Sequence, residues 1–94
     1  MKHSDLTDSI AKVIAKMDAV AQNGSAQDVD DHSQACNDVL VENDIILSDC
    51  IFSDGWFGFN GGSVLSADCI ANEIASQTTP AAQANVIDRF NSLG

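Results

Sequence analysis

Apolar residues recur every three or four positions at the start of this chain. Between Ser4 and Ala21 the set consists of Leu6, Ile10, Val13, Ile14, Met17, Val20 and Ala21. This spacing predicts an amphipathic α-helix that buries one face. Ser4 or Asp5 is the expected cap at its start, and the QNGS sequence at 22–25 is expected to end it. A chain that opens in this way needs further elements to cover that face.

A second periodic segment begins near Ala26. At about 100° per residue, one arc of about 140° contains Val29, Cys36, Val39, Leu40, Ile46, Leu47, Cys50 and Ile51. A neighbouring arc of about 80° contains Asp28, Asp31, Asp38, Glu42 and Asp49. We call these five carboxylates the acidic stripe, which on one continuous helix would extend over roughly 30 Å. The pattern favours a helix through at least Leu40.

The sequence after Leu40 also fits strands. The stretch VLVENDIILSDCIF is rich in β-branched residues. Val39–Val41 and Ile45–Leu47 could therefore pair as a short hairpin across residues 42–44. Beyond Leu40 the helix and the hairpin remain open alternatives.

Four of the five aromatic residues are concentrated in IFSDGWFGFNGG, residues 51–62. The Asp54-Gly55 pair between two apolar runs is a strong signal for a tight hairpin turn. Such a turn would bury most of these rings and leave Trp56 accessible at its tip. If the preceding helix runs through Ile51, the same residues form a rigid aromatic loop instead. Trp56 and Phe57 are therefore candidate anchors for a partner, since interfaces concentrate aromatic residues at their centres.

Two further helices are expected in the last third of the chain. In residues 63–77 the predicted inner face consists of Leu65, Cys69, Ile70 and Ile74. Thr79 as cap and Pro80 in the first turn predict a final helix, whose inner face consists of Val86, Ile87, Phe90 and Leu93. Residues 1–94 are thus expected to form one domain, a mostly α bundle of about four helices, or an α+β fold if residues 39–60 form strands.

The charge is strongly negative and unevenly placed. There are 14 Asp and Glu residues against 4 Lys and Arg, and no Lys or Arg occurs between Met17 and Asp88. Such a surface repels nucleic acid and anionic lipid, and it attracts basic protein surfaces. We therefore expect a basic protein partner and no direct binding to nucleic acid or membrane.

The N-terminal sequence and the cysteines indicate a reducing compartment. MKHSDLTDSI lacks the apolar core of a secretory signal. Three cysteines, Cys36, Cys50 and Cys69, are an odd number without close spacing, which disfavours a disulfide framework. We expect a cytoplasmic protein whose cysteines are buried free thiols.

Signatures of metal binding and catalysis are weak. His32 and Cys36 lie four residues apart and could face one metal ion, but the other two ligands of a zinc site are not indicated by spacing. His32 is instead expected to be a solvated helix residue. No calcium loop, phosphate loop or nucleophile–base pair matches a known pattern. We therefore expect a protein that is not an enzyme and has no cofactor.

Residues 56–58 form a W-x-G motif near the middle of a chain of 94 residues. The combination resembles the small helical-hairpin substrates of type VII secretion. That resemblance implies two long unbroken helices.

Charge and the aromatic patch together favour a protein-binding function. The leading hypothesis is a small acidic inhibitor that mimics nucleic acid and occupies the basic surface of a nucleic-acid-handling complex. In size and charge the chain is similar to phage-encoded inhibitors of host nucleases and CRISPR complexes. The alternatives are an immunity protein, antitoxin or secretion chaperone with one basic partner, and a homo-oligomer that buries the aromatic patch. The expected contacts are Asp28, Asp31, Asp38, Glu42, Asp49, Trp56 and Phe57.

Overall fold

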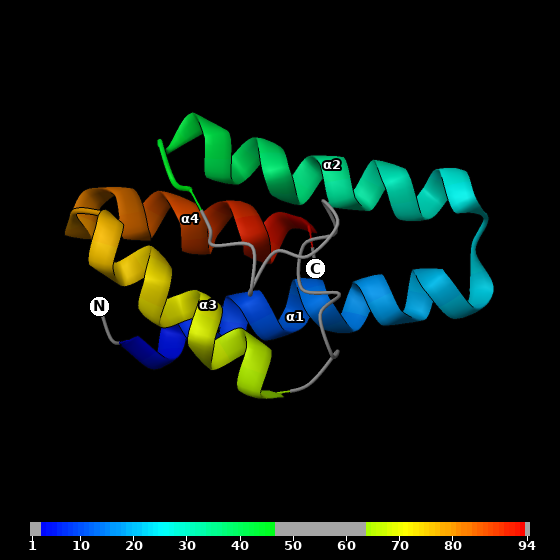
Figure 1. The fold of residues 1–94 in the computed structure, drawn as a ribbon, viewed down its shortest axis with the longest axis horizontal. Helices are drawn as coiled ribbons and strands as arrows, with labels where there is room; N and C mark the ends of the chain where they lie inside the picture. The colour runs from blue at the N-terminus through cyan, green and yellow to red at the C-terminus, as the bar shows by residue number, and fades with distance from the viewer. Residues whose placement is uncertain (1–2, 47–63, 94) are drawn as a thin grey trace.

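The computed structural model describes residues 3–46 and 64–93 (Figure 1). These residues form four α-helices: α1 (His3–Asn23), α2 (Ala26–Glu42), α3 (Val64–Gln77) and α4 (Pro80–Leu93). The expected mostly α bundle of about four helices is confirmed. The expectation of a hairpin across Asp54-Gly55 lies outside the described residues.

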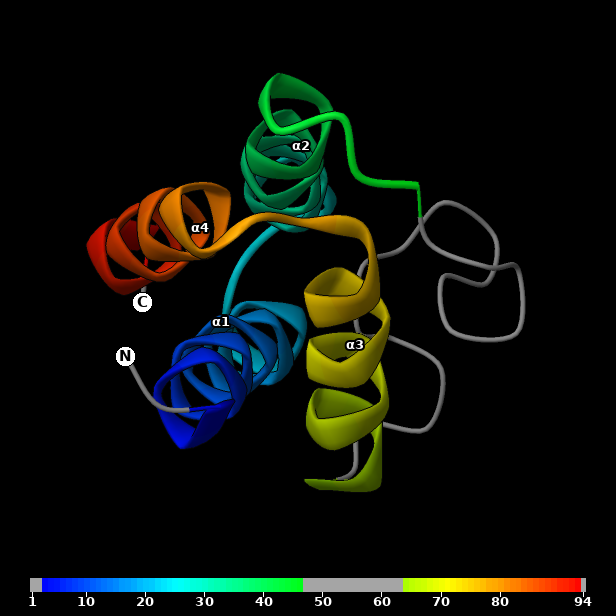
Figure 2. The same ribbon diagram turned by 90° about the vertical axis from the view of Figure 1, so that its left-hand side faces the viewer.

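Helix α1 is the central element of the bundle. It packs against α2, α3 and α4, and α2 also packs against α4. Figure 2 shows α1, α2 and α4 nearly end-on, whereas α3 crosses them steeply. Helix α4 therefore lies along the valley between α1 and α2, and α3 covers another side of α1.

The apolar face predicted for the first helix is the inner face of α1. Its buried members are Leu6, Ile10, Val13, Ile14 and Met17. Towards the end of the helix Val20 is half-buried and Ala21 is exposed. The helix already includes His3, so Ser4 and Asp5 lie in its first turn and do not cap it. Because α1 extends beyond α3 and α4 (Figure 1), these two helices do not cover its last apolar positions, which reach solvent.

A tight turn joins α1 to α2. The Gly24 amide donates to Val20 O at 2.7 Å, and a Cβ at this position would lie 2.8 Å from that oxygen. Ser25 then caps α2: its hydroxyl accepts from the Asp28 amide, and the Asp28 carboxylate accepts from the Ser25 amide. This reciprocal capping box fixes the first turn of α2.

Helix α2 ends at Glu42, and the strand pairing proposed for Val39–Val41 is therefore wrong. Asp44 adopts a left-handed conformation with φ 56°. The Asp44 amide donates to Val41 O and the Ile45 amide donates to Leu40 O, as in a Schellman motif. Ile45 and Leu40 are both buried in the same core, which completes the motif with its apolar contact.

The chain is no longer helical after this cap, so Ile46 does not continue the buried face of α2. Ile46 was expected on the inner face, but its side chain is 80% exposed. Its backbone is held by the side chain of Gln77 at the end of α3, which accepts from Ile46 N at 2.9 Å and donates to Ile46 O at 2.6 Å. Two polar backbone contacts, rather than apolar burial, thus dock this residue.

Replacing Asp44 with glycine is expected to stabilise the protein by about 1 kcal/mol, because glycine adopts positive φ without a steric cost. The substitution also removes a negative charge at the C-terminus of α2, where the helix dipole is unfavourable for it. Thermal unfolding should show a midpoint about 4–8 °C higher. The Asp44→Asn variant, which removes only the charge, is the control. A Gly variant no more stable than the Asn variant would contradict the backbone explanation.

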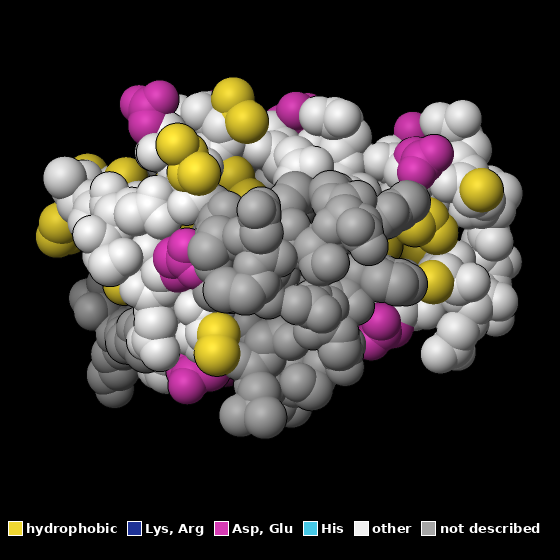
Figure 3. Space-filling model, viewed as in Figure 1, with side chains coloured by type: hydrophobic (Ala, Val, Ile, Leu, Met, Phe, Trp, Pro, Cys, Tyr) yellow, Lys and Arg dark blue, Asp and Glu magenta, His cyan; other side chains and the backbone are white. Residues whose placement is uncertain are grey.

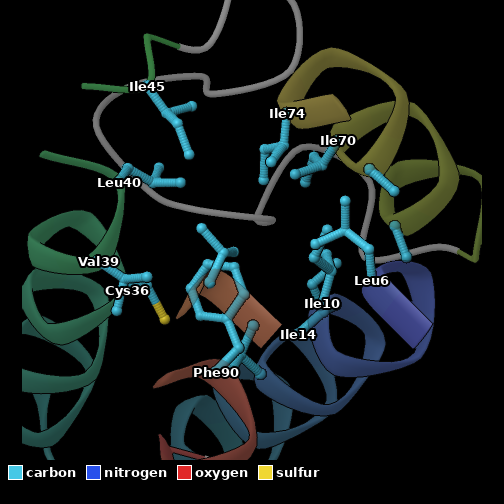
Figure 4. Close-up of a cluster of buried hydrophobic side chains, with 14 residues drawn as sticks. Leu6, Ile10, Ile14, Cys36, Val39, Leu40, Ile45, Ile70, Ile74 and Phe90 are labelled. Atoms are coloured by element: carbon cyan, nitrogen blue, oxygen red, sulfur yellow. The ribbon is translucent and has the colours of Figure 1, made fainter. Parts of the chain in front are cut away.

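Helices α3 and α4 complete the core. The Thr79 hydroxyl accepts from the Ala82 amide, so the predicted cap of α4 is confirmed. Val86 and Phe90 of α4 are fully buried, while Ile87 and Leu93 pack partly buried against the core. Figure 4 shows Phe90 extending between the side chains of α1 and those of α2.

The inner face of α3 differs from the prediction at Cys69. Ile70 and Ile74 are buried as expected, but their buried neighbours are Ala67 and Ala71, and Cys69 is exposed. At 100° per residue Cys69 points away from these four residues. The prediction that all three cysteines are buried is therefore wrong for Cys69, and the side chain of Cys50 lies outside the described residues.

Candidate acidic interface on helix α2

Four members of the acidic stripe lie on the solvent-exposed surface of α2, namely Asp28, Asp31, Asp38 and Glu42. The helix contains no Lys or Arg. On the face drawn in Figure 3, Asp and Glu side chains occur along the edge formed by α2, and no Lys or Arg of the described residues is visible. The other predicted contacts, Asp49, Trp56 and Phe57, lie outside the described residues.

Two carboxylates of the stripe are held by glutamines one turn earlier. Gln27 Nε2 donates to Asp31 Oδ1 at 2.8 Å, and Gln34 Nε2 donates to Asp38 Oδ1 at 2.9 Å. Each pair has the i, i+4 spacing that stabilises a helix by roughly 0.2–0.5 kcal/mol. The two pairs repeat after seven residues, or roughly 10 Å along the helix axis.

The hydrogen bonds of Gln27 and Gln34 were not predicted, although their signal is present in the sequence. A Gln precedes an Asp by four residues twice in AQDVDDHSQACND. Because residues four apart are neighbours on a helix surface, this pattern predicts both hydrogen bonds once the helix is accepted. The bonds restrict the carboxylate rotamers and so reduce the entropy lost when a partner binds them.

The first and the last of the four described carboxylates of the stripe are engaged within the protein. Asp28 belongs to the capping box with Ser25. At the other end, Glu42 Oε1 lies 3.2 Å from Arg89 Nη2, and Asn85 Nδ2 donates to Glu42 Oε2 at 3.4 Å. The Glu42 and Arg89 side chains are 41% and 46% exposed, so this ion pair is worth only about 0–1 kcal/mol. It nevertheless offsets the charge of Glu42, and the net negative charge of the four described members of the stripe is concentrated between Asp28 and Asp38.

His32 and Cys36 belong to the core. His32 was expected to be solvated, but it is only 6% exposed, and its Nε2 lies 2.9 Å from Val13 O. Since a carbonyl oxygen only accepts hydrogen bonds, Nε2 carries the proton in this contact. Cys36 Sγ lies 3.8 Å from the same nitrogen. Within residues 3–46 and 64–93, no group of three or more His, Cys, Asp or Glu side chains is arranged to hold a metal ion.

Burial also governs the chemistry of Cys36. Its side chain is 0% exposed, and burial raises the pKa of its thiol from 9.0 to about 12, although the positive charge of Lys16 acts in the opposite direction. A thiol with this pKa remains protonated at neutral pH and is a poor nucleophile or metal ligand. The His32–Cys36 pair therefore acts as a packed and hydrogen-bonded part of the core.

An open groove adjoins the N-terminal half of the stripe. Figure 1 shows α4 ending about midway along α1 and α2, which both continue past it. In this region the structure has a groove of about 610 Å³. Its walls comprise Lys16, Ala19, Val20, Asn23, Gly24, Asp28, Asp31, His32, Ala35 and Leu93. Two members of the stripe, Asp28 and Asp31, thus border a largely apolar surface.

None of the helices in the described part of the chain is both long enough and apolar enough to cross a bilayer. Helices α1 and α2 are separated at residues 24–25 and helices α3 and α4 at residues 78–79, unlike the two long helices implied by the W-x-G resemblance. Residues 56–58 themselves lie outside the described residues. Comparison of the chain with family models, curated proteins and solved structures finds no match, so a function must be argued from the acidic stripe and the groove beside it.

Proposed function

We propose that this protein binds a basic surface on a nucleic-acid-handling protein through the acidic stripe of α2, and thereby excludes nucleic acid from that surface. The observation that carries the proposal is the pair of carboxylates, Asp31 and Asp38, held by Gln27 and Gln34 on a helix without basic residues. Carboxylates fixed on a rigid element can replace phosphates in contacts with Lys and Arg. The proposed role involves no catalysis.

The net charge of the protein supports long-range attraction to such a partner. The formal charge is −10 at pH 7. Complementary charge raises association rates with a basic surface and repels free nucleic acid. The net effect is preferential binding to the surfaces that nucleic acid itself uses.

The spacing of the stripe limits what charge alone can contribute. Asp31 and Asp38 are roughly 10 Å apart along the axis, whereas one DNA strand carries a phosphate about every 3.4 Å. The stripe is therefore less densely charged than the nucleic acid with which it would compete. Competition then requires additional contacts, and the apolar groove beside Asp28 and Asp31 is available for them.

Neutralising the stripe with Asp31→Asn and Asp38→Asn is expected to slow association with the partner by about 3–10-fold, while dissociation changes less. Candidate partners would first be captured on the immobilised protein from the lysate of a candidate host cell, at low and at high salt. They would then be identified by mass spectrometry. Rates would then be measured on the purified partner, with labelled DNA or RNA as competitor. The matched control is Asp8→Asn with Asp88→Asn, which removes the same charge from exposed positions on α1 and α4.

Three results would refute the proposal. The first is binding that does not change with salt. The second is equal association rates for the stripe variant and the control variant. The third is a partner that retains its nucleic acid when this protein is bound.

A second candidate is the neutralisation of one basic effector by a cognate immunity protein, antitoxin or chaperone. The pairing of Glu42 with Arg89 favours it, because an internally cancelled charge suits a partner matched by shape better than a general phosphate mimic. This candidate shares the salt dependence of the first. It predicts a single partner, and binding that added nucleic acid does not reverse.

A further inference from the structure

The groove beside the stripe is a continuation of the valley that α4 occupies. Helix α4 fills the first part of this valley by inserting Val86 and Phe90, which are both fully buried. It ends at Leu93, whose carbonyl accepts from Lys16 Nζ at 2.6 Å. Beyond Leu93 the valley remains open between the last turns of α1 and the first turns of α2.

We propose that this groove binds the apolar face of a basic amphipathic helix from a partner protein, with Lys or Arg side chains of that helix contacting Asp28 and Asp31. The inference rests on the proposed function. It adds the chemical class of the binding partner: a cationic helix with apolar residues at three-and-four spacing.

The shape of the groove suits a helix. Ala19 of α1 and Ala35 of α2 both line it, and side chains this small let another backbone approach closely. The volume of about 610 Å³ lies within the ~300–1,000 Å³ typical of ligand sites. A helix that follows the axis of α4 would place one or two turns of apolar side chains there, as helices do in other apolar grooves.

The charges around the groove select a cationic occupant. Asp28 and Asp31 border it from α2, and each has its carboxylate oriented by a hydrogen bond. The one Lys or Arg on its walls is Lys16, whose ammonium donates to Leu93 O. A second copy of this chain is a poorer occupant, because two molecules of charge −10 repel each other.

The test uses a fluorescein-labelled amphipathic peptide of about four helical turns, composed of Leu, Ala and Lys, with anisotropy as the readout. A peptide with Glu at every Lys position is the charge control. Ala19→Trp fills the groove from an exposed position of α1, and Ala11→Trp places the same side chain at another exposed position of that helix. Asp31→Asn removes one charge at the edge of the groove, and circular dichroism verifies that each variant is folded.

We expect the Lys peptide to bind the native protein and the Ala11→Trp variant equally. Binding should weaken at least about 10-fold with Ala19→Trp and about 2–5-fold with Asp31→Asn at low salt, because the first blocks the site and the second removes one ion pair. Chemical-shift changes should concentrate at residues 16–20 and 28–35. The Glu peptide should not bind.

The inference is overturned if Ala19→Trp binds the Lys peptide as tightly as the native protein, since the peptide would then bind the acidic surface in general. It is also overturned if the Glu peptide binds equally well, if neither peptide binds, or if sedimentation reveals a dimer that Ala19→Trp dissociates. The proposed function fails separately, because it is refuted by a purified partner that retains its nucleic acid while this protein is bound, whether or not a cationic helix enters the groove.

Discussion

Replacing Phe90 with alanine is expected to lower the free energy of unfolding by about 3–5 kcal/mol. Phe90 is 0% exposed, and it is the one Phe, Trp or Tyr in the part of the chain that the structure describes. It inserts from α4 between Ile10 and Ile14 of α1 and Cys36 and Val39 of α2 (Figure 4). Truncation would remove the contacts that join three helices and would leave a cavity at their centre.

This loss is large compared with the total stability of a chain of this size, roughly 5–15 kcal/mol. Urea unfolding followed by circular dichroism measures it. Phe90→Leu should cost less, because it keeps most of the buried apolar surface, and Leu93→Ala should cost less because Leu93 is only partly buried. A Phe90→Ala variant within about 1 kcal/mol of the native protein would contradict the central role of this side chain.

Raising the pH from 9 towards 12 is expected to destabilise the fold through Cys36. Burial raises the pKa of this thiol from 9.0 to about 12, so the folded state retains a proton that the unfolded chain releases. The resulting stabilisation is fully present below pH 9 and is lost as the pH rises to about 12. At 1.36 kcal/mol per pKa unit the full effect is about 4 kcal/mol.

The comparison with Cys36→Ala isolates this effect, because both proteins share every other group that titrates at high pH. Urea unfolding at a series of pH values should show the native protein losing stability faster than the variant above pH 9. Parallel curves for the two proteins would contradict the prediction.

The same thiol should also resist alkylation. A rise in pKa from 9.0 to about 12 lowers the thiolate fraction about 1,000-fold at neutral pH, and burial blocks access of the reagent. Cys69 is exposed and should react with iodoacetamide before Cys36 does. Peptide mapping by mass spectrometry assigns the modification to each cysteine, and equal rates at Cys36 and Cys69 would show that Cys36 is not sequestered.

Local sequence signals determined most of the helical architecture. The three-and-four spacing located α1, and Thr79 with Pro80 gave the start of α4. These signals succeed because helix periodicity and capping involve residues only a few positions apart. The exposure of Asp28, Asp31, Asp38 and Glu42 followed from the same periodicity, since residues beside an apolar arc face solvent.

The predicted burial of three sets of residues was wrong or incomplete. His32 lies within the apolar arc of α2, four residues before Cys36, and its burial was predictable from that position. Ile46 is exposed because the Schellman motif at Asp44 ends the helix, so the 100° step no longer applies beyond it. The inner face of α3 was assigned to its larger apolar residues alone, but Ala67 and Ala71 also face the core, beside Ile70 and Ile74.

The sequence by itself therefore located α1, the start of α2 and the last two helices, and it identified the acidic face of α2, but it left the end of α2 open. Tertiary packing decided how far along α1 and α2 their inner faces are buried. Helix α4 stops midway along α1 and α2, and this difference in length leaves the groove beside Asp28 and Asp31. The pairing of Glu42 with Arg89 likewise joins residues far apart in the chain. The periodicity of one helix specifies its own faces, but the length and position of the neighbouring helices decide how much of each face they cover.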